Sequence, residues 1–272
     1  MSAISAAPDN VTAEPVERFL VEPADWVEEF GKVPEERTKF GMRILSKDLS
    51  KGVPANGSWA RQVIFPAGFE NNPHFHSAPQ FQVLLEGSVQ FPTHHLTAPA
   101  VHYADAFSPY GPFTCGEGFK IMIIRPWLAK KYNMFERSTR GLRNPYGRNK
   151  YGEQKRNLYG QVDPASWISI DGHQRQQLLG APAADHLDGP VAELIRLQPG
   201  TSIANDAALT EFALFVIVFD GEITIKGQTL KPYSSYFARG IHDDPMVAGA
   251  SGATILRCAF DNMAHPANMP AS

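Results

Sequence analysis

The chain has 272 residues, of which 43% are hydrophobic and 19% charged, and this is enough for the core of one large or two small globular domains. Its formal net charge of -3 argues against nucleic acid or an anionic membrane as a partner and favours a small molecule. The two cysteines, Cys115 and Cys258, are far apart and form no C-x-x-C pair, so the sequence indicates neither a disulfide framework nor a thiolate zinc site.

The N-terminal segment, residues 1–57, is predicted to be an extension that leads into the first folded domain. Its opening, MSAISAAPDNVTAEP, lacks the basic and apolar regions of a secretory signal, and no later run is apolar for long enough to span a membrane. We therefore expect a cytoplasmic protein with a disordered start. An amphipathic stretch from Trp26 to Phe30 favours a short helix, followed by an edge strand within residues 23–49.

Residues 58–135 consist of short, alternating segments bounded by turns: SWARQVIF, QFQVLLEGSVQF, HYADAFSPY and FKIMIIRPW. Such segments at this spacing predict the strands of a β-sandwich or a small β-barrel. Residues 187–265 repeat the pattern with VAELIRLQPG, EFALFVIVFDGEITIKG, SSYFARG and ATILRCAF. The sequence thus predicts two β domains in one chain.

The two β domains look like a diverged internal repeat. Gly68 and Gly200 differ by 132 positions, and Gly87 and Gly221 differ by 134. Arg125 and Arg257, again 132 apart, supply a third anchor. We expect these three pairs to occupy equivalent places.

Residues 136–186, between the two β domains, are rich in Gly, Tyr and basic side chains. Over the first part of this segment seven Lys and Arg residues face only Glu136 and Glu153. Such charge with interleaved tyrosines is compatible with a nucleic-acid surface. Because the rest of the chain is acidic, we favour a solvated linker that wraps a barrel or a dimer neighbour.

A histidine pair lies at the start of the second strand segment of the first domain. Residues 68–87 read G-x5-H-x-H-x3-Q-x6-G, with His74, His76 and Gln80 at the polar positions. This resembles the first motif of the cupin superfamily, G-x5-H-x-H-x3-E-x6-G, with Gln80 where the family has glutamate. The later PYGPFT, residues 109–114, resembles the P-x-G-x-x-H core of the second cupin motif, with Thr114 in place of histidine.

The resemblance implies an all-β bicupin: two tandem jelly-roll (double-stranded β-helix) barrels with few short helices, which form a homodimer. It also implies a divalent transition metal in the N-terminal barrel, Fe(II) in the first place and Mn, Ni or Zn as alternatives. The second domain is expected to hold no metal, since residues such as Asp206 and Ala208 stand at its ligand positions and His242 fits a polar turn.

Strand geometry supports a site in the first barrel. Side chains alternate along a strand, so His74 and His76 point the same way and can grip one ion. The polar residues Gln80 and Gln82, with Leu84, share one face of the next strand. A neutral amide at position 80 offers the metal no anionic ligand, which lowers its affinity. The third ligand is therefore Gln80 or one of His94, His95 and His102.

The resulting functional hypothesis is an iron-dependent dioxygenase that acts on a small aromatic or β-dicarbonyl compound. Gln80 is the third ligand or a hydrogen-bond donor to the bound substrate or oxygen. The candidate substrate contacts are Arg61, Gln82, Leu84, Thr114 and Arg125, and the two arginines suit an acidic group as bidentate donors. Two alternatives remain: an isomerase, lyase or decarboxylase in the same barrel, and a non-catalytic small-molecule binding protein.

Overall fold

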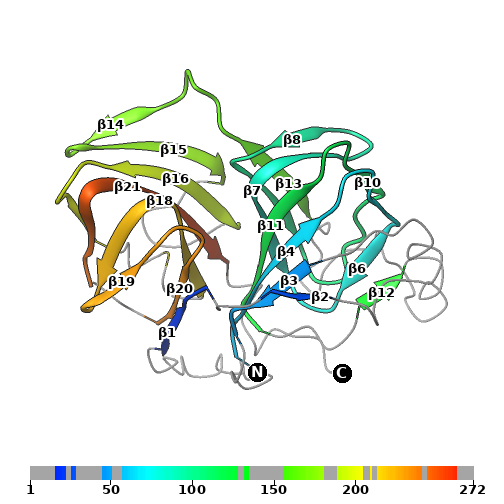
Figure 1. The fold of residues 1–272 in the computed structure, drawn as a ribbon, viewed down its shortest axis with the longest axis horizontal. Helices are drawn as coiled ribbons and strands as arrows, with labels where there is room; N and C mark the ends of the chain where they lie inside the picture. The colour runs from blue at the N-terminus through cyan, green and yellow to red at the C-terminus, as the bar shows by residue number, and fades with distance from the viewer. Residues whose placement is uncertain are drawn as a thin grey trace, which may run out of the picture.

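The structure is a computed structural model that describes residues 16–22, 26–28, 45–50, 57–127, 132–134, 156–180, 189–204, 209, 213–240 and 244–261. These residues form two curled β-sheets side by side, one for each predicted domain, and a small third sheet (Figure 1). The all-β prediction is confirmed. Within the described ranges, no helix has the length and apolar character needed to span a membrane.

The sheet of the first barrel follows the order β13-β9-β7-β11-β4-β3-β2. Its strands are β2 (Val27–Glu28), β3 (Leu45–Asp48), β4 (Trp59–Phe65), β5 (Glu70–Asn71), β7 (Gln80–Gln90), β8 (His95–Thr97), β9 (Ala100–Ala104), β10 (Phe113–Thr114), β11 (Phe119–Arg125) and β13 (Asn157–Gln161). The small sheet pairs β6 (His74–His76) with β12 (Tyr132–Met134). The expected helix around Trp26 is wrong at Val27 and Glu28, which instead pair with β3 because the sheet offers them an open edge.

The sheet of the second barrel follows the order β1-β20-β18-β21-β16-β15-β14. Its strands are β1 (Val16–Leu20), β14 (Ile168–Ile170), β15 (His173–Leu179), β16 (Val191–Leu197), β17 (Ser202–Ile203), β18 (Ala213–Ile225), β19 (Gln228–Leu230), β20 (Ser235–Arg239) and β21 (Met246–Phe260). All neighbouring strands in both sheets are antiparallel.

The strand register shows how the two barrels correspond. Gly87 lies opposite Phe119 in the first barrel, and Gly221 lies opposite Ala253 in the second, an offset of 134 in both strands. Both pairs of strands also shift register at the same place, since Leu85 and Phe219 are each skipped by the partner strand. A shared bulge at an equivalent position supports duplication of one ancestral domain.

The third sequence anchor is wrong by two residues. At an offset of 134, Arg257 corresponds to Ile123, and Arg125 corresponds to Ala259. The second half has two more residues than the first between the positions of Gly68 and Gly87, so the offset between equivalent residues changes there from 132 to 134. An alignment that keeps the offset of 132 from Gly68 onwards therefore pairs the wrong residues in the later strands. Arg125 is therefore a feature of the first barrel alone.

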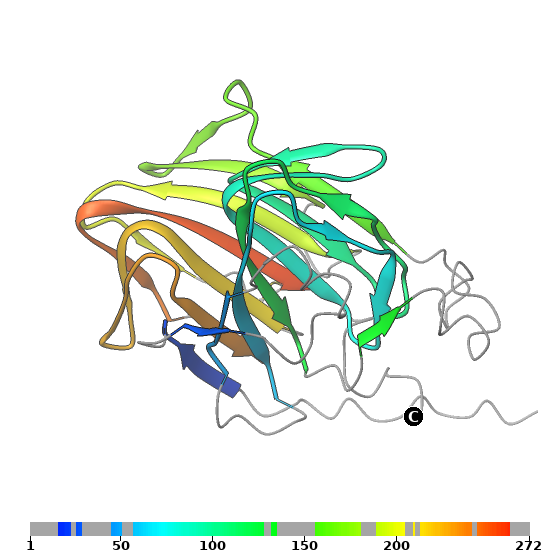
Figure 2. The same cartoon turned by 45° about the vertical axis from the view of Figure 1, so that its right-hand side comes forward.

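The first strand of each half lies in the sheet of the other half. β1 precedes the first barrel in sequence but pairs with β20 of the second, beside which it appears in dark blue (Figures 1 and 2). β13 precedes the second barrel but pairs with β9, the equivalent of β20. The pairing thus crosses the predicted domain bounds twice, since β1 falls within residues 1–57 and β13 within residues 136–186.

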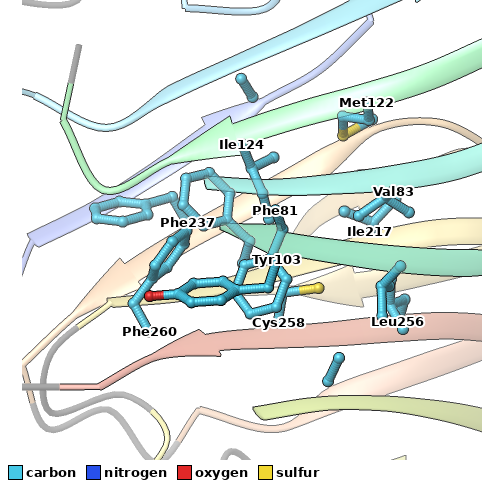
Figure 3. Packing of buried hydrophobic residues seen from close by; sticks show 14 of the residues in the cluster. Phe81, Val83, Tyr103, Met122, Ile124, Ile217, Phe237, Leu256, Cys258 and Phe260 are labelled. Carbon is cyan, nitrogen blue, oxygen red and sulfur yellow. The ribbon is translucent and has the colours of Figure 1, made fainter. Parts of the chain in front are cut away.

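A shared hydrophobic core joins the back faces of the two barrels (Figure 3). Phe81, Val83 and Leu85 of β7 point into it, as the sequence predicts, and Phe215 and Ile217 of β18 are their counterparts. The ring of Phe81 lies 4.8 Å from that of Phe260, centre to centre. The second barrel therefore covers the outer face of the first, an apolar face that would otherwise meet water.

Gly87 gives a test of the close approach between β7 and the chain that leads into β11. Gly87 and Gly227 both have a φ of +77°, so alanine costs both about 1 kcal/mol of backbone strain. A Cβ at Gly87 would also lie 2.5 Å from the carbonyl oxygen of Gly118, whereas a Cβ at Gly227 would meet nothing within 4 Å. Gly87→Ala should therefore lower the free energy of unfolding in urea at least twice as much as Gly227→Ala, and equal losses would contradict this.

Candidate functional site

The interior of the first barrel is divided into an apolar and a polar part. The apolar part contains Phe65, Leu84, Phe91, Phe113 and Ile121, from several strands. The polar part is a buried cluster that we call the Tyr110 cluster: His74, Gln80, Gln82, His102, Tyr110 and Arg125. At the positions equivalent to Gln80 and Gln82 the second barrel has Leu214 and Val216, which lie in a continuous apolar core. Among the described residues, the second barrel instead buries the ion pair of Glu193 and Arg257.

Tyr110 is the centre of the cluster. Its hydroxyl lies 2.7 Å from Nε2 of His74, 2.6 Å from Nε2 of Gln80 and 2.9 Å from Nε2 of Gln82. The two amide groups donate to the phenol oxygen, so the phenol proton is directed to the histidine. These three contacts use the full hydrogen-bonding capacity of a hydroxyl group.

The backbone holds His74 and Tyr110 together. The amide of each residue donates to the carbonyl oxygen of the other, at 3.1 and 3.0 Å. The imidazole Nδ1 donates to the carbonyl oxygen of Asn72 at 2.8 Å, which leaves a lone pair on Nε2 to accept the phenol proton. The local fold therefore fixes both the position and the tautomer of His74.

Arg125 fixes the orientation of Gln80. Its Nε and Nη2 atoms donate to Oε1 of Gln80 at 3.0 and 2.7 Å, and its guanidinium stacks on the ring of Trp59 at 4.6 Å. Because the carbonyl oxygen of Gln80 faces the cation, its NH2 group must face Tyr110. Desolvation by burial lowers the pKa of Arg125 to about 10.

His102 extends the cluster to β13. Its Nδ1 lies 2.9 Å from Oε1 of Gln82, and its Nε2 lies 2.8 Å from Oδ1 of Asn157. Asn157 also donates to the carbonyl oxygen of Pro109, next to Tyr110. A neutral ring donates to one of these two oxygens. The exchanged strand β13 thus closes the cluster.

Some predicted site residues lie outside the cluster. His76 and Arg61 are half-buried; the ring of His76 lies 5.3 Å from that of His74, and Arg61 donates to Ser46. Leu84 belongs to the apolar part, and Thr114 is exposed on β10. Of the alternative ligands, His95 is exposed and His94 stacks on Phe91 and Tyr159, so only His102 belongs to the cluster. Asp206, Ala208 and His242 lie outside the described residues.

Sequence reasoning missed Tyr110 and Asn157. Tyr110 stands inside PYGPFT, but the motif directs attention to the histidine position, Thr114. A signal was present, because Gly111 with a φ of +90° turns the chain directly after Tyr110. Asn157 carries no such signal, since it lies in a segment that reads as a polar linker.

The cluster as arranged does not fit a divalent metal. Within the described ranges, no three His, Cys, Asp or Glu side chains lie close enough to hold an ion together. Nε2 of His74 accepts from the phenol, and Oε1 of Gln80 accepts from Arg125. A buried guanidinium also opposes a second cation nearby. The polar groups therefore suit proton transfer or the binding of an anion.

The burial of His102 predicts a pH dependence of stability. Desolvation lowers its pKa to about 4, whereas the unfolded side chain titrates near 6.5. The neutral ring stabilises the fold above pH 6.5, and this contribution is lost as the pH falls from 6.5 towards 4, up to about 3 kcal/mol. Urea unfolding at pH 7 and pH 4.5 should show a smaller pH effect in His102→Gln than in the wild type. Parallel pH profiles would contradict this.

The comparisons with known proteins agree on the fold. No protein-family model and no curated protein matches the sequence. A proposed dioxygenase from Nostoc punctiforme is similar in structure with a TM-score of 0.56 and 11% identity, over 95% of this chain and 86% of the other. Quercetin 2,3-dioxygenase from Acinetobacter baumannii gives 0.51 and 12%, over 91% and 79%. A bacterial pirin from Escherichia coli in complex with nickel(II) gives 0.51 and 12%, over 80% and 92%.

Identities this low establish the architecture and leave the chemistry to the residues of each protein. The matches extend over both barrels, and the shared bulge and equivalent strand order show that the barrels are two copies of one unit. The chain therefore has the bicupin fold, two tandem cupin barrels.

Proposed function

We propose that the N-terminal barrel is an enzyme site that moves a proton to or from a small organic substrate, as isomerases, lyases and decarboxylases do. The observation that carries this proposal is the convergence of His74, Gln80 and Gln82 on the hydroxyl of Tyr110 within 2.9 Å. The phenol of Tyr110 can act as a general acid, and the imidazole of His74, which is hydrogen-bonded to it, can act as the base.

Each residue of the cluster has a part in this chemistry. Tyr110 gives its proton to the substrate atom that gains an electron pair, and the amide donors of Gln80 and Gln82 stabilise the phenolate. Nε2 of His74 accepts the proton that leaves the substrate carbon and returns it to a carbon of the product, while the carbonyl of Asn72 holds its Nδ1–H. Because three contacts already saturate the phenol, a substrate oxygen must accept the phenol proton in place of Nε2 of His74, which frees that nitrogen to act as a base. No electrons are transferred and no oxidant is needed.

A metal-dependent dioxygenase is the second candidate. The tautomer of His74 favours it, because an imidazole that donates through Nδ1 presents the Nε2 lone pair that metals bind. The likeness to the quercetin 2,3-dioxygenase and to the nickel-bound pirin points the same way. Iron held by His74 and His76 would supply oxygen activation, and it requires Tyr110 to leave Nε2 of His74.

One experiment separates the candidates. The purified wild-type protein is incubated in D2O with β-dicarbonyl compounds and 2-oxo acids, while NMR follows exchange of the carbon-bound protons and an electrode follows O2. We expect exchange without O2 uptake, unchanged after dialysis against EDTA. Uptake of O2 with stoichiometric iron by elemental analysis would replace the proposal by the dioxygenase. Neither exchange nor uptake, with a ligand still bound, would indicate a binding protein.

A further inference from the structure

We infer that the substrate of the N-terminal barrel carries a carboxylate group, which Arg125 binds. The inference rests on the proposed function and names the substrate class of the same site. Arg125 is 6% exposed, and its hydrogen bonds among the described residues go to the neutral carbonyl oxygen of Gln80. Its guanidinium also stacks on the ring of Trp59. A buried guanidinium normally has an anionic partner, because its desolvation is costly without one.

The same chain supplies carboxylates to two other arginines. Arg257, inside the second barrel, donates through Nε to Glu193 at 2.6 Å. Arg156 forms ion pairs with Asp105 at 2.9 Å and with Asp261 at 2.7 Å. Arg125 differs from both, since its nearest acceptor is an amide at the position where the cupin motif has glutamate. Burial lowers the pKa of Arg125, Tyr110 partly opposes this, and the positive charge of Arg61 lowers the pKa further.

Arg125 lies near a partly exposed end of the barrel interior. It follows Ile121 and Ile123 on the inward face of β11, and Ile123 lies opposite Arg61 of β4. Although Ile123 and Arg61 point inward, both are half-exposed, so water reaches this end of the barrel interior.

The amide of Gln80 shows how a ligand would be held. Its oxygen accepts from Arg125 at 2.7 Å and its nitrogen donates to Tyr110 at 2.6 Å, so one planar group connects the guanidinium to the phenol. A ligand that displaces this amide meets the same two partners. A carboxylate fits the two donors of Arg125, and a neighbouring carbonyl oxygen accepts the proton of Tyr110 when the hydroxyl turns from Nε2 of His74 towards it. Small oxo acids have this arrangement.

Thermal shift and calorimetry test the inference with acetate and pyruvate as probes and acetamide and pyruvamide as neutral controls. We expect the two carboxylates to stabilise the wild-type protein more than the amides do. Arg125→Met should weaken pyruvate binding on the order of tenfold or more. Arg196→Gln removes an exposed arginine that stacks on Trp167 in the second barrel, and it should leave binding unchanged.

Gln80→Glu is the sharper variant, because it keeps Arg125 and gives it a carboxylate of nearly the same shape. It should raise the melting temperature of the free protein and abolish pyruvate binding. Equal stabilisation by carboxylates and amides, or full binding by either Arg125→Met or Gln80→Glu, would overturn the inference. Loss of binding in these variants, without proton exchange by the wild type, would leave the carboxylate site standing and reject the catalytic proposal alone.

Discussion

Replacing Tyr110 by phenylalanine is expected to abolish proton exchange and to lower the free energy of unfolding by about 3 kcal/mol. The ring remains, but His74, Gln80 and Gln82 each lose the partner that satisfies a buried polar atom. The loss should appear in kcat with a smaller effect on KM, since the phenol acts in the transition state. Urea unfolding and deuterium exchange measure the two effects on the same sample.

Tyr236→Phe is the matched control. Tyr236 is fully buried on the inward face of β20, at the position equivalent to His102, and its hydroxyl has no hydrogen-bond partner among the described residues. Removal of this hydroxyl should leave stability unchanged or raise it, and it should not affect exchange. If the two variants lost the same stability, the hydrogen bonds of Tyr110 would not support the fold as we describe.

Glu193→Gln is expected to lower the free energy of unfolding by about 4 kcal/mol, the largest loss we predict for a conservative change. Glu193 and Arg257 are 4% and 2% exposed and form an ion pair inside the second barrel. The amide removes the negative charge of Glu193 from beside the buried guanidinium. Chemical denaturation at pH 7 gives the value directly.

The double variant Glu193→Leu, Arg257→Met separates the charge effect from packing. It removes both charges and keeps most of the volume, so it should recover most of the stability that Glu193→Gln loses. Pyruvate binding in the first barrel should remain as in the wild type in both variants. A double variant no more stable than Glu193→Gln would show that the pair stabilises the barrel through packing alone.

The sequence predicts the elements of this fold better than their pairing. Alternation along β7 correctly separates Gln80 and Gln82 from Phe81 and Val83, because the two faces of the strand meet different environments. It does not show that β1 and β13 exchange barrels, since short strands with few apolar residues read as linkers. Strand partners are fixed by contacts between distant residues, which local pattern does not contain.

The location of the candidate site could be predicted from the sequence. The hydrogen-bond partners within the site could not. The motif spacing places His74 and Gln80 in the first barrel, where both are found. The partners of Gln80 depend on the register of β11, which a bulge shifts, and on Tyr110 from a loop thirty residues further along the chain. The sequence also suggested Arg125 as a substrate contact, but only the structure shows that its hydrogen-bonding partner is a neutral amide.

The exchange of β1 and β13 makes the two barrels thermodynamically inseparable. If either barrel lost its structure, the other would lose an edge strand and expose the open edge of β9 or β20. Heat and denaturant should therefore unfold the whole chain in one cooperative transition. Two identical polypeptides adopt the same topology when they form a domain-swapped dimer, in which the first strand of each joins the sheet of the other. The duplicated chain thus has the arrangement of a domain-swapped dimer within a single molecule.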